Sequence, residues 1–244
     1  MSGVMLITGG GRGIGAATAR LAAESGYTVC VNYRADERSA RELASRIGHQ
    51  ATAVQGDVSS EPDVLRIFKE VDRVGRLAVL VNNAGIVDRS SRVENLSAER
   101  IQRMLAVNVT GSFLCAREAV KRMSTKHGGK GGAIVNVSSM AAKLGGAGDY
   151  VDYAASKGAI DSFTVGLAKE VGAEGIRVNA VRPGVIRTEI HATSGDPGRV
   201  ERIGATAALQ RGGDAEEVAR AILWLASAEA SYITGALLDV SGGR

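Results

Sequence analysis

The chain has 244 residues, 45% of them hydrophobic, and a formal net charge of +4 at pH 7, which suits one α/β domain with a sizeable core. Its apolar runs are shorter than the roughly 20 residues that a membrane-spanning helix needs, so we expect no membrane partner. Its Lys and Arg residues are dispersed, and their densest cluster, residues 121–130, lacks aromatic side chains, so nucleic acid is not expected as a partner either.

Strand and helix patterns alternate along the whole chain. The first predicted strand, Val4–Ile7, is followed by a predicted helix over Gly13–Glu24. Further strands are predicted at Thr28–Asn32, Ala51–Gln55, Leu77–Asn82, Ala133–Val137, Arg177–Val181 and Ala236–Asp239. Further helices are predicted at Glu37–Ile47, Glu61–Val74, Ala98–Lys126, Tyr153–Ala173 and Ala215–Ala226. This alternation, without a linker or an internal repeat, indicates a single α/β domain over residues 1–244, with a doubly wound, seven-stranded, mostly parallel sheet and helices on both faces.

A glycine-rich turn at residues 8–15 (TGGGRGIG) joins the first strand to the first helix. Gly9 lets the chain turn sharply, Gly13 lets the backbone approach a pyrophosphate, and Gly15 lets helix and strand pack closely. A plain flexible loop is the alternative, but strand, turn and helix in this order favour a Rossmann-type dinucleotide site. The predicted contacts are Gly9, Gly11, Arg12, Gly13, Ile14 and Gly15.

The end of the second strand bears on which dinucleotide is bound. A carboxylate there usually accepts a hydrogen bond from the ribose 2′-hydroxyl of NAD, but this chain has Asn32, Tyr33 and Arg34. Arg12 and Arg34 together can hold a 2′-phosphate, because guanidinium matches phosphate geometry. We therefore favour NADP, with NAD as the alternative; two solvated arginines would be the non-functional explanation.

Polar and small residues follow the third and fourth strands. Asp57, next to Val58, can accept from an adenine amino group, although Asp at such a place is as often a helix cap. Asn83, Ala84 and Gly85 allow the backbone to pass close to adenosine, or form an ordinary turn. Because the carboxyl ends of parallel strands lie at one edge, both segments are expected near the glycine turn.

Three later motifs complete this edge of the sheet. Asn108 interrupts an apolar helical run, where it either caps a local bend or holds water in a site. Ser139, after Ser138, ends the fifth strand, where its hydroxyl can donate to a substrate carbonyl or form a turn. A rigid turn with a backbone suited to an amide-bearing ring follows the sixth strand and contains Pro183, Gly184, Ile186 and Thr188.

Tyr153 and Lys157 lie four residues apart in a predicted helix and therefore share one helix face. A phenol is a poor acid or base at neutral pH, and a neighbouring cation draws its pKa toward the working range. The pair is thus a candidate general acid/base unit. Taken alone, surface packing would explain it as well.

Together these motifs resemble the short-chain dehydrogenase/reductase family, over essentially the whole chain. In order, they are the Thr-Gly-x3-Gly-x-Gly turn at residues 8–15, Asn-Asn-Ala-Gly at residues 82–85, Asn108, Ser139, Tyr153-x3-Lys157, and Pro-Gly with Thr188. The resemblance implies an enzyme that transfers a hydride between NADP or NAD and a small-molecule carbonyl or secondary alcohol. It also implies a homotetramer.

The resemblance implies a role for each catalytic residue. Tyr153 exchanges a proton with the substrate oxygen, while Lys157 binds the nicotinamide ribose and lowers the Tyr153 pKa. Ser139 steadies the developing oxyanion, and Asn108 positions a water that links Lys157 to solvent. The turn with Ile186 and Thr188 holds the carboxamide.

One departure from the family concerns the spacing of Ser139 and Tyr153, which is one residue longer than usual. The glycine-rich segment 143–152 can absorb this residue as a bulge. Tyr150 also lies nearby, but Ala154 follows it at the fourth position, so it lacks the cation and is interpreted as a pocket-wall residue.

Residues 189–213 have the length and small-residue content of a substrate lid. They contain no aromatic residue, which favours polar, sugar-like or acyl substrates. Arg199 and Arg202 in this segment are interpreted as solubilising a surface helix. The chain resembles the 3-oxoacyl-carrier-protein reductase and glucose-dehydrogenase-like branches, which the sequence does not separate.

Two other functions stay open. One is a catalytically silent dinucleotide-binding sensor or scaffold, against which the complete catalytic set argues. The other is a sugar-nucleotide epimerase, which shares the Tyr-x3-Lys chemistry but carries a sizeable C-terminal substrate domain.

Composition also bears on metals and compartment. His49, His127 and His191 are far apart, so we expect no metal site. Cys30 and Cys115 have apolar neighbours and are predicted to be buried, reduced thiols. The first strand begins so early that a signal peptide has no room, and a cytoplasmic location is expected.

Overall fold

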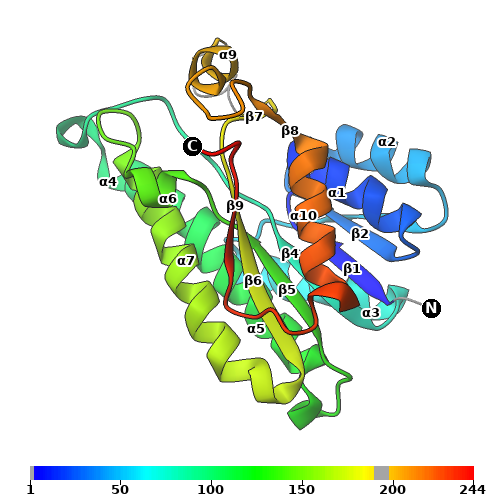
Figure 1. The fold of residues 1–244 in the computed structure, drawn as a ribbon. Helices are drawn as coiled ribbons and strands as arrows, with labels where there is room; N and C mark the ends of the chain where they lie inside the picture. The colour runs from blue at the N-terminus through cyan, green and yellow to red at the C-terminus, as the bar shows by residue number, and fades with distance from the viewer. Residues whose placement is uncertain (1–2, 190–197) are drawn as a thin grey trace.

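The structure, a computed structural model, describes residues 3–189 and 198–244. Seven strands form one sheet in the order β3-β2-β1-β4-β5-β6-β9, and every neighbouring pair is parallel (Figure 1). They span Val4–Ile7 (β1), Thr28–Tyr33 (β2), Ala51–Gln55 (β3), Leu77–Asn82 (β4), Gly132–Val137 (β5), Ile176–Pro183 (β6) and Leu237–Val240 (β9). The predicted doubly wound sheet is confirmed, and its strand order reverses between β1 and β4.

Helices cover both faces of this sheet (Figure 1). One face carries α1 (Gly13–Glu24), α2 (Glu37–Ile47) and α10 (Ala215–Ala226); the other carries α3 (Glu61–Val74), α5 (Gly111–Met123) and α7 (Val151–Val171). The shorter helices α4 (Ala98–Leu105), α6 (Ala141–Leu144) and α9 (Arg199–Gly204) stand beyond the carboxyl ends of the strands. None of these described helices combines the length and apolarity that a bilayer crossing requires.

Several short elements connect the main ones. Single 3₁₀ turns occupy Val93–Asn95, Thr125–His127, Gly172–Glu174 and Ala228–Ala230. A second sheet, which the sequence did not reveal, pairs β7 (Ile186–Arg187) with β8 (Gly213–Asp214) in parallel. Residues 190–197 of the predicted lid, His191 among them, lie outside the described residues.

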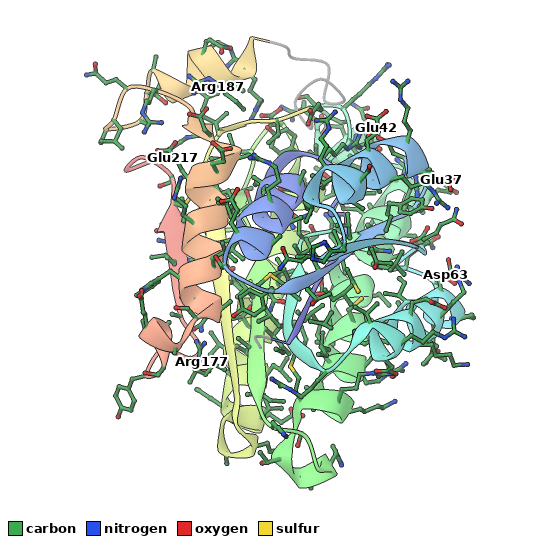
Figure 2. All side chains as sticks on the ribbon, turned by 90° about the vertical axis from the view of Figure 1, so that its right-hand side faces the viewer. Glu37, Glu42, Asp63, Arg177, Arg187 and Glu217 are labelled. Carbon is green, nitrogen blue, oxygen red and sulfur yellow. The ribbon has the colours of Figure 1, made fainter. Side chains whose placement is uncertain are left out.

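The outer helix faces carry charge, as Figure 2 shows for α2 and α3. On α2, Arg41 pairs with Glu37 at 2.6 Å and Arg38 pairs with Glu42 at 2.8 Å, each four residues apart. The opposite face of α2 places Ala40 in the core. This amphipathic pattern explains why the helix lies flat against the sheet.

The predicted helix over residues 98–126 is not continuous. It divides into α4, a π-helical turn at Ala106–Thr110, and α5, which ends at Met123. The break surrounds Asn108, whose side-chain oxygen accepts from Ile86 N at 2.8 Å and whose amide donates to Ile86 O at 2.9 Å. Bonding to the segment after β4 draws this turn out of regular α-helix geometry.

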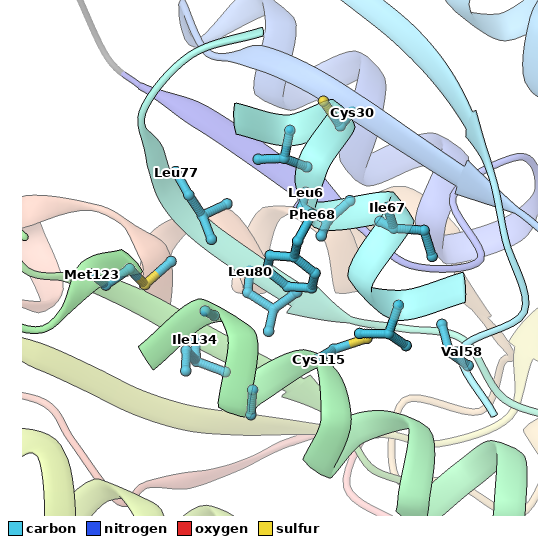
Figure 3. Packing of buried hydrophobic residues seen from close by; sticks show 14 of the residues in the cluster. Leu6, Cys30, Val58, Ile67, Phe68, Leu77, Leu80, Cys115, Met123 and Ile134 are labelled. Carbon is cyan, nitrogen blue, oxygen red and sulfur yellow. The ribbon is translucent and has the colours of Figure 1, made fainter. Parts of the chain in front are cut away.

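The core on the α3, α5 and α7 face is built around Phe68, which is fully buried. Leu80, Ile134 and Cys115 surround it in the packing shown in Figure 3. Cys30 lies in the same cluster, and both thiols are free of disulfide bonds. Burial raises the pKa of each thiol to about 12, so both are neutral packing groups.

Candidate active site

A cleft of about 860 Å³ opens at the carboxyl ends of the strands, where their order reverses. It brings together almost every residue that the sequence predicts for a site: Gly9, Gly11, Arg12, Gly13, Ile14, Asn32, Tyr33, Arg34, Asp57, Val58, Asn83, Ala84, Gly85, Ser139, Tyr153, Lys157, Pro183, Gly184, Ile186 and Thr188. Gly15 and Asn108 lie behind the cleft wall instead.

Gly15 shapes the glycine turn from behind. A side chain at this position would meet Asn83 Nδ2 and Gly9 O at 2.7 Å, so only glycine fits. Asn83 Nδ2 in turn donates to the carbonyls of Thr8 and Gly9, both at 2.9 Å. The loop after β4 therefore fixes the turn in the shape that lines the cleft.

The Asn32 side chain braces the ends of three neighbouring strands. Its Oδ1 accepts from Gly9 N at 3.2 Å, and its Nδ2 donates to Val54 O at 3.2 Å and Gly56 O at 3.0 Å. Asn32 lines the cleft, but only 2% of its surface is exposed, and its side-chain amide is hydrogen-bonded to the protein backbone.

Two cations flank the cleft near the end of β2. Arg34 Nη1 lies 3.7 Å from Asp57 Oδ2, and 63% of the Arg34 side chain is exposed. The other Asp57 oxygen accepts from the N–H and the hydroxyl of Ser59, at 2.9 and 2.7 Å. Arg12 is exposed just before α1. The Asp57 carboxylate is thus already hydrogen-bonded, while Arg34 presents most of its guanidinium to solvent.

Ser139, Tyr153 and Lys157 meet in the middle of the cleft. Desolvation raises the pKa of Tyr153, and a hydrogen bond with Ser139 opposes that shift. Lys157 Nζ donates to Val137 O at 2.8 Å and lies 5.7 Å from the centre of the Tyr153 ring. Burial lowers the pKa of Lys157 to about 8, against the attraction of Asp161. The three polar side chains thus lie together in the lining of the cleft.

A glycine turn accommodates the extra residue between Ser139 and Tyr153. After α6 the backbone φ angles of Gly145, Gly146 and Gly148 are 77°, 62° and 70°, in the region that favours glycine. Tyr150 then precedes α7 as its N-cap residue and lines the cleft. The longer spacing therefore leaves Ser139 beside Tyr153.

Asn108 supports the cleft floor from below. Besides its two bonds to Ile86, Nδ2 donates to Ser156 Oγ at 3.0 Å. A side chain at Gly85 would meet both Asn108 Oδ1 and Lys157 Nζ at 3.4 Å, so these two polar groups lie on one side of Gly85. Of the two sequence alternatives, the structure shows the local bend. The water-holding role stays a prediction.

Sequence reasoning missed two features of the site. Ser156 accepts the hydrogen bond from Asn108 and donates to Tyr153 O at 2.7 Å. In the sequence, its position directly before Lys157 was the only, weak indication of a role in the site. Arg199 was interpreted as a surface residue, and this was wrong. Its side chain is 13% exposed, it pairs with Asp149 at 2.7 Å, and it lines the cleft. Its partner lies 50 residues away in the chain, beyond the reach of local patterns.

The chain is similar in sequence to known oxidoreductases over nearly its whole length. Residues 9–244 match the family model described as enoyl-(acyl carrier protein) reductase. The chain is 58% identical to the uncharacterized oxidoreductase YgfF of Escherichia coli (strain K12), with 99% of each chain covered. It is 38% identical to a 3-oxoacyl-[acyl-carrier-protein] reductase of Synechocystis and 38% identical to a glucose 1-dehydrogenase of Gluconobacter oxydans, covering 98% of this chain and 96% and 90% of theirs.

Comparison with solved structures gives the same result. The crystal structure of 3-ketoacyl-(acyl-carrier-protein) reductase from Brucella melitensis, complexed with NADH, superposes with a TM-score of 0.93 at 33% identity. The alignment covers 99% of this chain and 97% of that one. A short-chain dehydrogenase/reductase mutant of Serratia marcescens aligns with a TM-score of 0.90. With sequence, sheet order and cleft in agreement, the chain belongs to the short-chain dehydrogenase/reductase family of oxidoreductases.

Proposed function

We propose that the protein interconverts a small carbonyl compound and the corresponding secondary alcohol, using NADP in preference to NAD. The observation that carries this proposal is the convergence of Ser139, Tyr153 and Lys157 in a cleft that the glycine turn also lines. A bound nicotinamide dinucleotide would supply or take up the hydride.

The residues present suit such a cofactor. The glycine turn offers a wall without bulky side chains ahead of the α1 N-terminus, where a pyrophosphate is favoured. Thr188 packs against Gly13 at the same wall, which supports its role toward the carboxamide. Arg12 and the exposed Arg34 support the NADP preference, because both can meet a 2′-phosphate.

The proposed mechanism assigns the proton to Tyr153. During reduction its hydroxyl protonates the substrate oxygen, while the Ser139 hydroxyl donates a hydrogen bond to that oxygen as charge develops. The Lys157 ammonium, close to the ring, binds ribose hydroxyls and favours the phenolate that remains. Asn108 holds the floor beneath Lys157.

Substitution of Tyr153 by Phe tests this function. A panel of ketones, aldehydes, sugars and acyl thioesters is assayed with NADPH and NADH to find a substrate. Tyr153→Phe should then lower kcat by about 10²–10⁴-fold with little effect on cofactor binding, since only the proton donor is lost. Tyr232→Phe, at a fully exposed position, is the matched control. A folded Tyr153→Phe protein that kept most of its rate would refute the mechanism.

The same panel decides between this function and its alternatives. A catalytically silent sensor or scaffold would bind NADPH but oxidise it with no carbonyl compound. An epimerase would interconvert sugar nucleotides without net consumption of cofactor. The intact Ser139, Tyr153 and Lys157 geometry favours the oxidoreductase over the silent protein.

Three further expectations complete the proposal. A homotetramer is supported by an exposed apolar groove between α5 and α7, where Phe113 stacks on Phe163 with ring centres 3.8 Å apart. A cytoplasmic location is supported by the two thiols, which form no disulfide. Residues 189–213 act as a lid, on the strength of Glu189 and Arg199 in the cleft lining.

A further inference from the structure

A second tyrosine, Tyr150, lines the cleft beside Tyr153. The Tyr150 ring lies 5.9 Å from the Tyr153 ring, centre to centre, with the two planes at 85°. Both residues line the cleft. A carbonyl compound that bonds to the Tyr153 hydroxyl would therefore have the Tyr150 ring as a neighbour.

The Tyr150 ring is braced from α9. The Arg199 guanidinium carbon lies 4.8 Å from the ring centre, in a cation–π contact. Arg199 Nη2 pairs with Asp149 Oδ2 at 2.7 Å, and these side chains are 13% and 28% exposed. The Arg199 guanidinium, itself paired with Asp149, thus packs against the Tyr150 ring.

The backbone holds the ring equally firmly. Tyr150 N donates to Gly146 O at 2.9 Å, and a side chain at Gly146 would meet Tyr150 O at 2.9 Å. From the segment after β4, Ser91 N donates to Asp149 O at 2.8 Å. These bonds fix the backbone that carries the ring, and a swing of the ring itself would break its contact with Arg199 of α9.

We propose that Tyr150 is the specificity-determining residue that restricts the neighbouring substituent of the substrate carbonyl to a compact group. Because this inference rests on the proposed function, its substrate class is the small ketones, aldehydes and corresponding alcohols among those that Tyr153 would serve. The braced Tyr150 ring excludes bulkier substituents, because it is the aromatic side chain that lines the cleft beside Tyr153.

A matched pair of diketones tests the inference: diacetyl as the compact substrate and benzil as the bulky one, each reduced with NADPH. The readout is the ratio of kcat/KM for benzil to kcat/KM for diacetyl, which partial unfolding of a variant does not change. Tyr150→Ala should raise this ratio by about tenfold or more, because it removes the obstructing ring. Tyr150→Leu serves if the alanine variant does not fold.

Two further variants isolate the ring and its brace. Tyr150→Phe keeps the ring and should leave the ratio near the wild-type value. Arg199→Met removes the brace and should raise the ratio, less than Tyr150→Ala does. An unchanged ratio in both Tyr150→Ala and Tyr150→Leu overturns this inference alone. If the wild-type protein binds NADPH yet reduces no carbonyl compound, the proposed function itself fails, and this inference with it.

Discussion

Lys157 carries its charge where little water reaches it. Only 5% of its surface is exposed, and burial lowers the pKa of its ammonium to about 8 from the model-peptide value of 10.5. A buried charge with a single carbonyl partner, Val137 O, opposes folding. Under the proposed mechanism, the same charge is what favours the Tyr153 phenolate.

Replacing Lys157 by Met should therefore stabilise the fold while abolishing turnover. The pKa shift corresponds to a penalty on the order of 3 kcal/mol, and loss of the Val137 bond offsets about 1 kcal/mol of the gain. Urea unfolding at pH 7 should show the Lys157→Met protein as the more stable. Lys169→Met, on the exposed side of the same helix, should change little.

The stability difference between Lys157→Met and the wild-type protein should decrease as the pH rises. Because the folded-state pKa of Lys157 lies below the unfolded value, the penalty is fully present below pH 8. It fades as pH rises toward 10.5, where lysine is neutral in both states. The stability advantage of Lys157→Met should shrink across this window. An advantage that is constant with pH would show that charge burial is not its cause.

At the ribose end of the cleft, Arg34 should decide the cofactor. Arg34→Asp removes a phosphate partner and adds a carboxylate that repels the 2′-phosphate. We expect NADP to bind roughly tenfold to a hundredfold more weakly, equivalent to about 1–3 kcal/mol, and NAD to bind more tightly. Fluorescence titration with both cofactors measures this, with Arg73→Asp on α3 as control. Tighter binding of NAD than NADP by the wild-type protein would contradict the assignment.

Residue type and short spacing were enough to anticipate which side chains share the cleft. Tyr153 and Lys157 were singled out by their helical spacing and Ser139 by its place at a strand end, and the structure places all three in one cleft, while their catalytic roles stay predictions. Asn108 was noticed because an amide in an apolar run needs partners, but those partners, Ile86 and Ser156, are set by tertiary contacts. Arg199 leaves no such local pattern, because its carboxylate partner Asp149 lies 50 residues away in the chain.

At the scale of elements, one buried ion pair ties α4 to the start of α7. Arg100 Nε lies 2.8 Å from Asp152 Oδ2, and these side chains are 14% and 3% exposed. Arg100 Nη1 also donates to Arg89 O at 2.8 Å. Since Asp152 directly precedes Tyr153, this pair fixes the helix turn that carries the proposed acid.

Breaking only one side of this pair should be costly. Asp152→Ala leaves the largely buried Arg100 without its carboxylate and should destabilise the protein by about 3 kcal/mol. The double variant Arg100→Met with Asp152→Leu should recover most of that loss, because no unpaired charge remains. Chemical denaturation measures each value. Glu42→Ala, in an exposed pair, should cost less than about 1 kcal/mol.

The long helix over residues 98–126 shows why element boundaries escape sequence patterns. Its apolar periodicity runs through Asn108 without a Pro or a stop signal, so one helix was predicted. The bonds from Asn108 to Ile86 interrupt it, and they depend on the packing of a loop 22 residues away. The two-residue strands β7 and β8 were missed because they are too short to show a period.

At the scale of the whole molecule, α5 and α7 expose an apolar surface. Phe113 is 47% exposed and stacks on Phe163, beside Leu167 in the groove. The number of strands and their parallel arrangement followed from alternation, whereas the order of strands in the sheet needed the structure. The tetramer proposal identifies the partner of this surface as a second copy of the chain.

Phe113→Glu should therefore dissociate the proposed tetramer. Burying a carboxylate in an apolar contact raises the free energy of association by several kcal/mol, and in a symmetric oligomer this penalty applies at each copy of the interface. Light scattering at micromolar concentration should give about four times 25.2 kDa for the wild-type chain and a smaller mass for the variant. Val93→Glu, at an exposed site on another face, is the control. A wild-type mass near 25.2 kDa would exclude the tetramer.

The two buried thiols also allow the opening of the protein interior to be measured by chemical labelling. Cys30 on β2 and Cys115 on α5 are fully buried, and only a thiolate attacks a thiol reagent. Each can be labelled only when the sheet and the helices above it separate for a moment. The labelling rate, followed by absorbance with an aromatic disulfide, then measures how often this interior opens, and its slowing by added NADPH reads out cofactor affinity without any substrate.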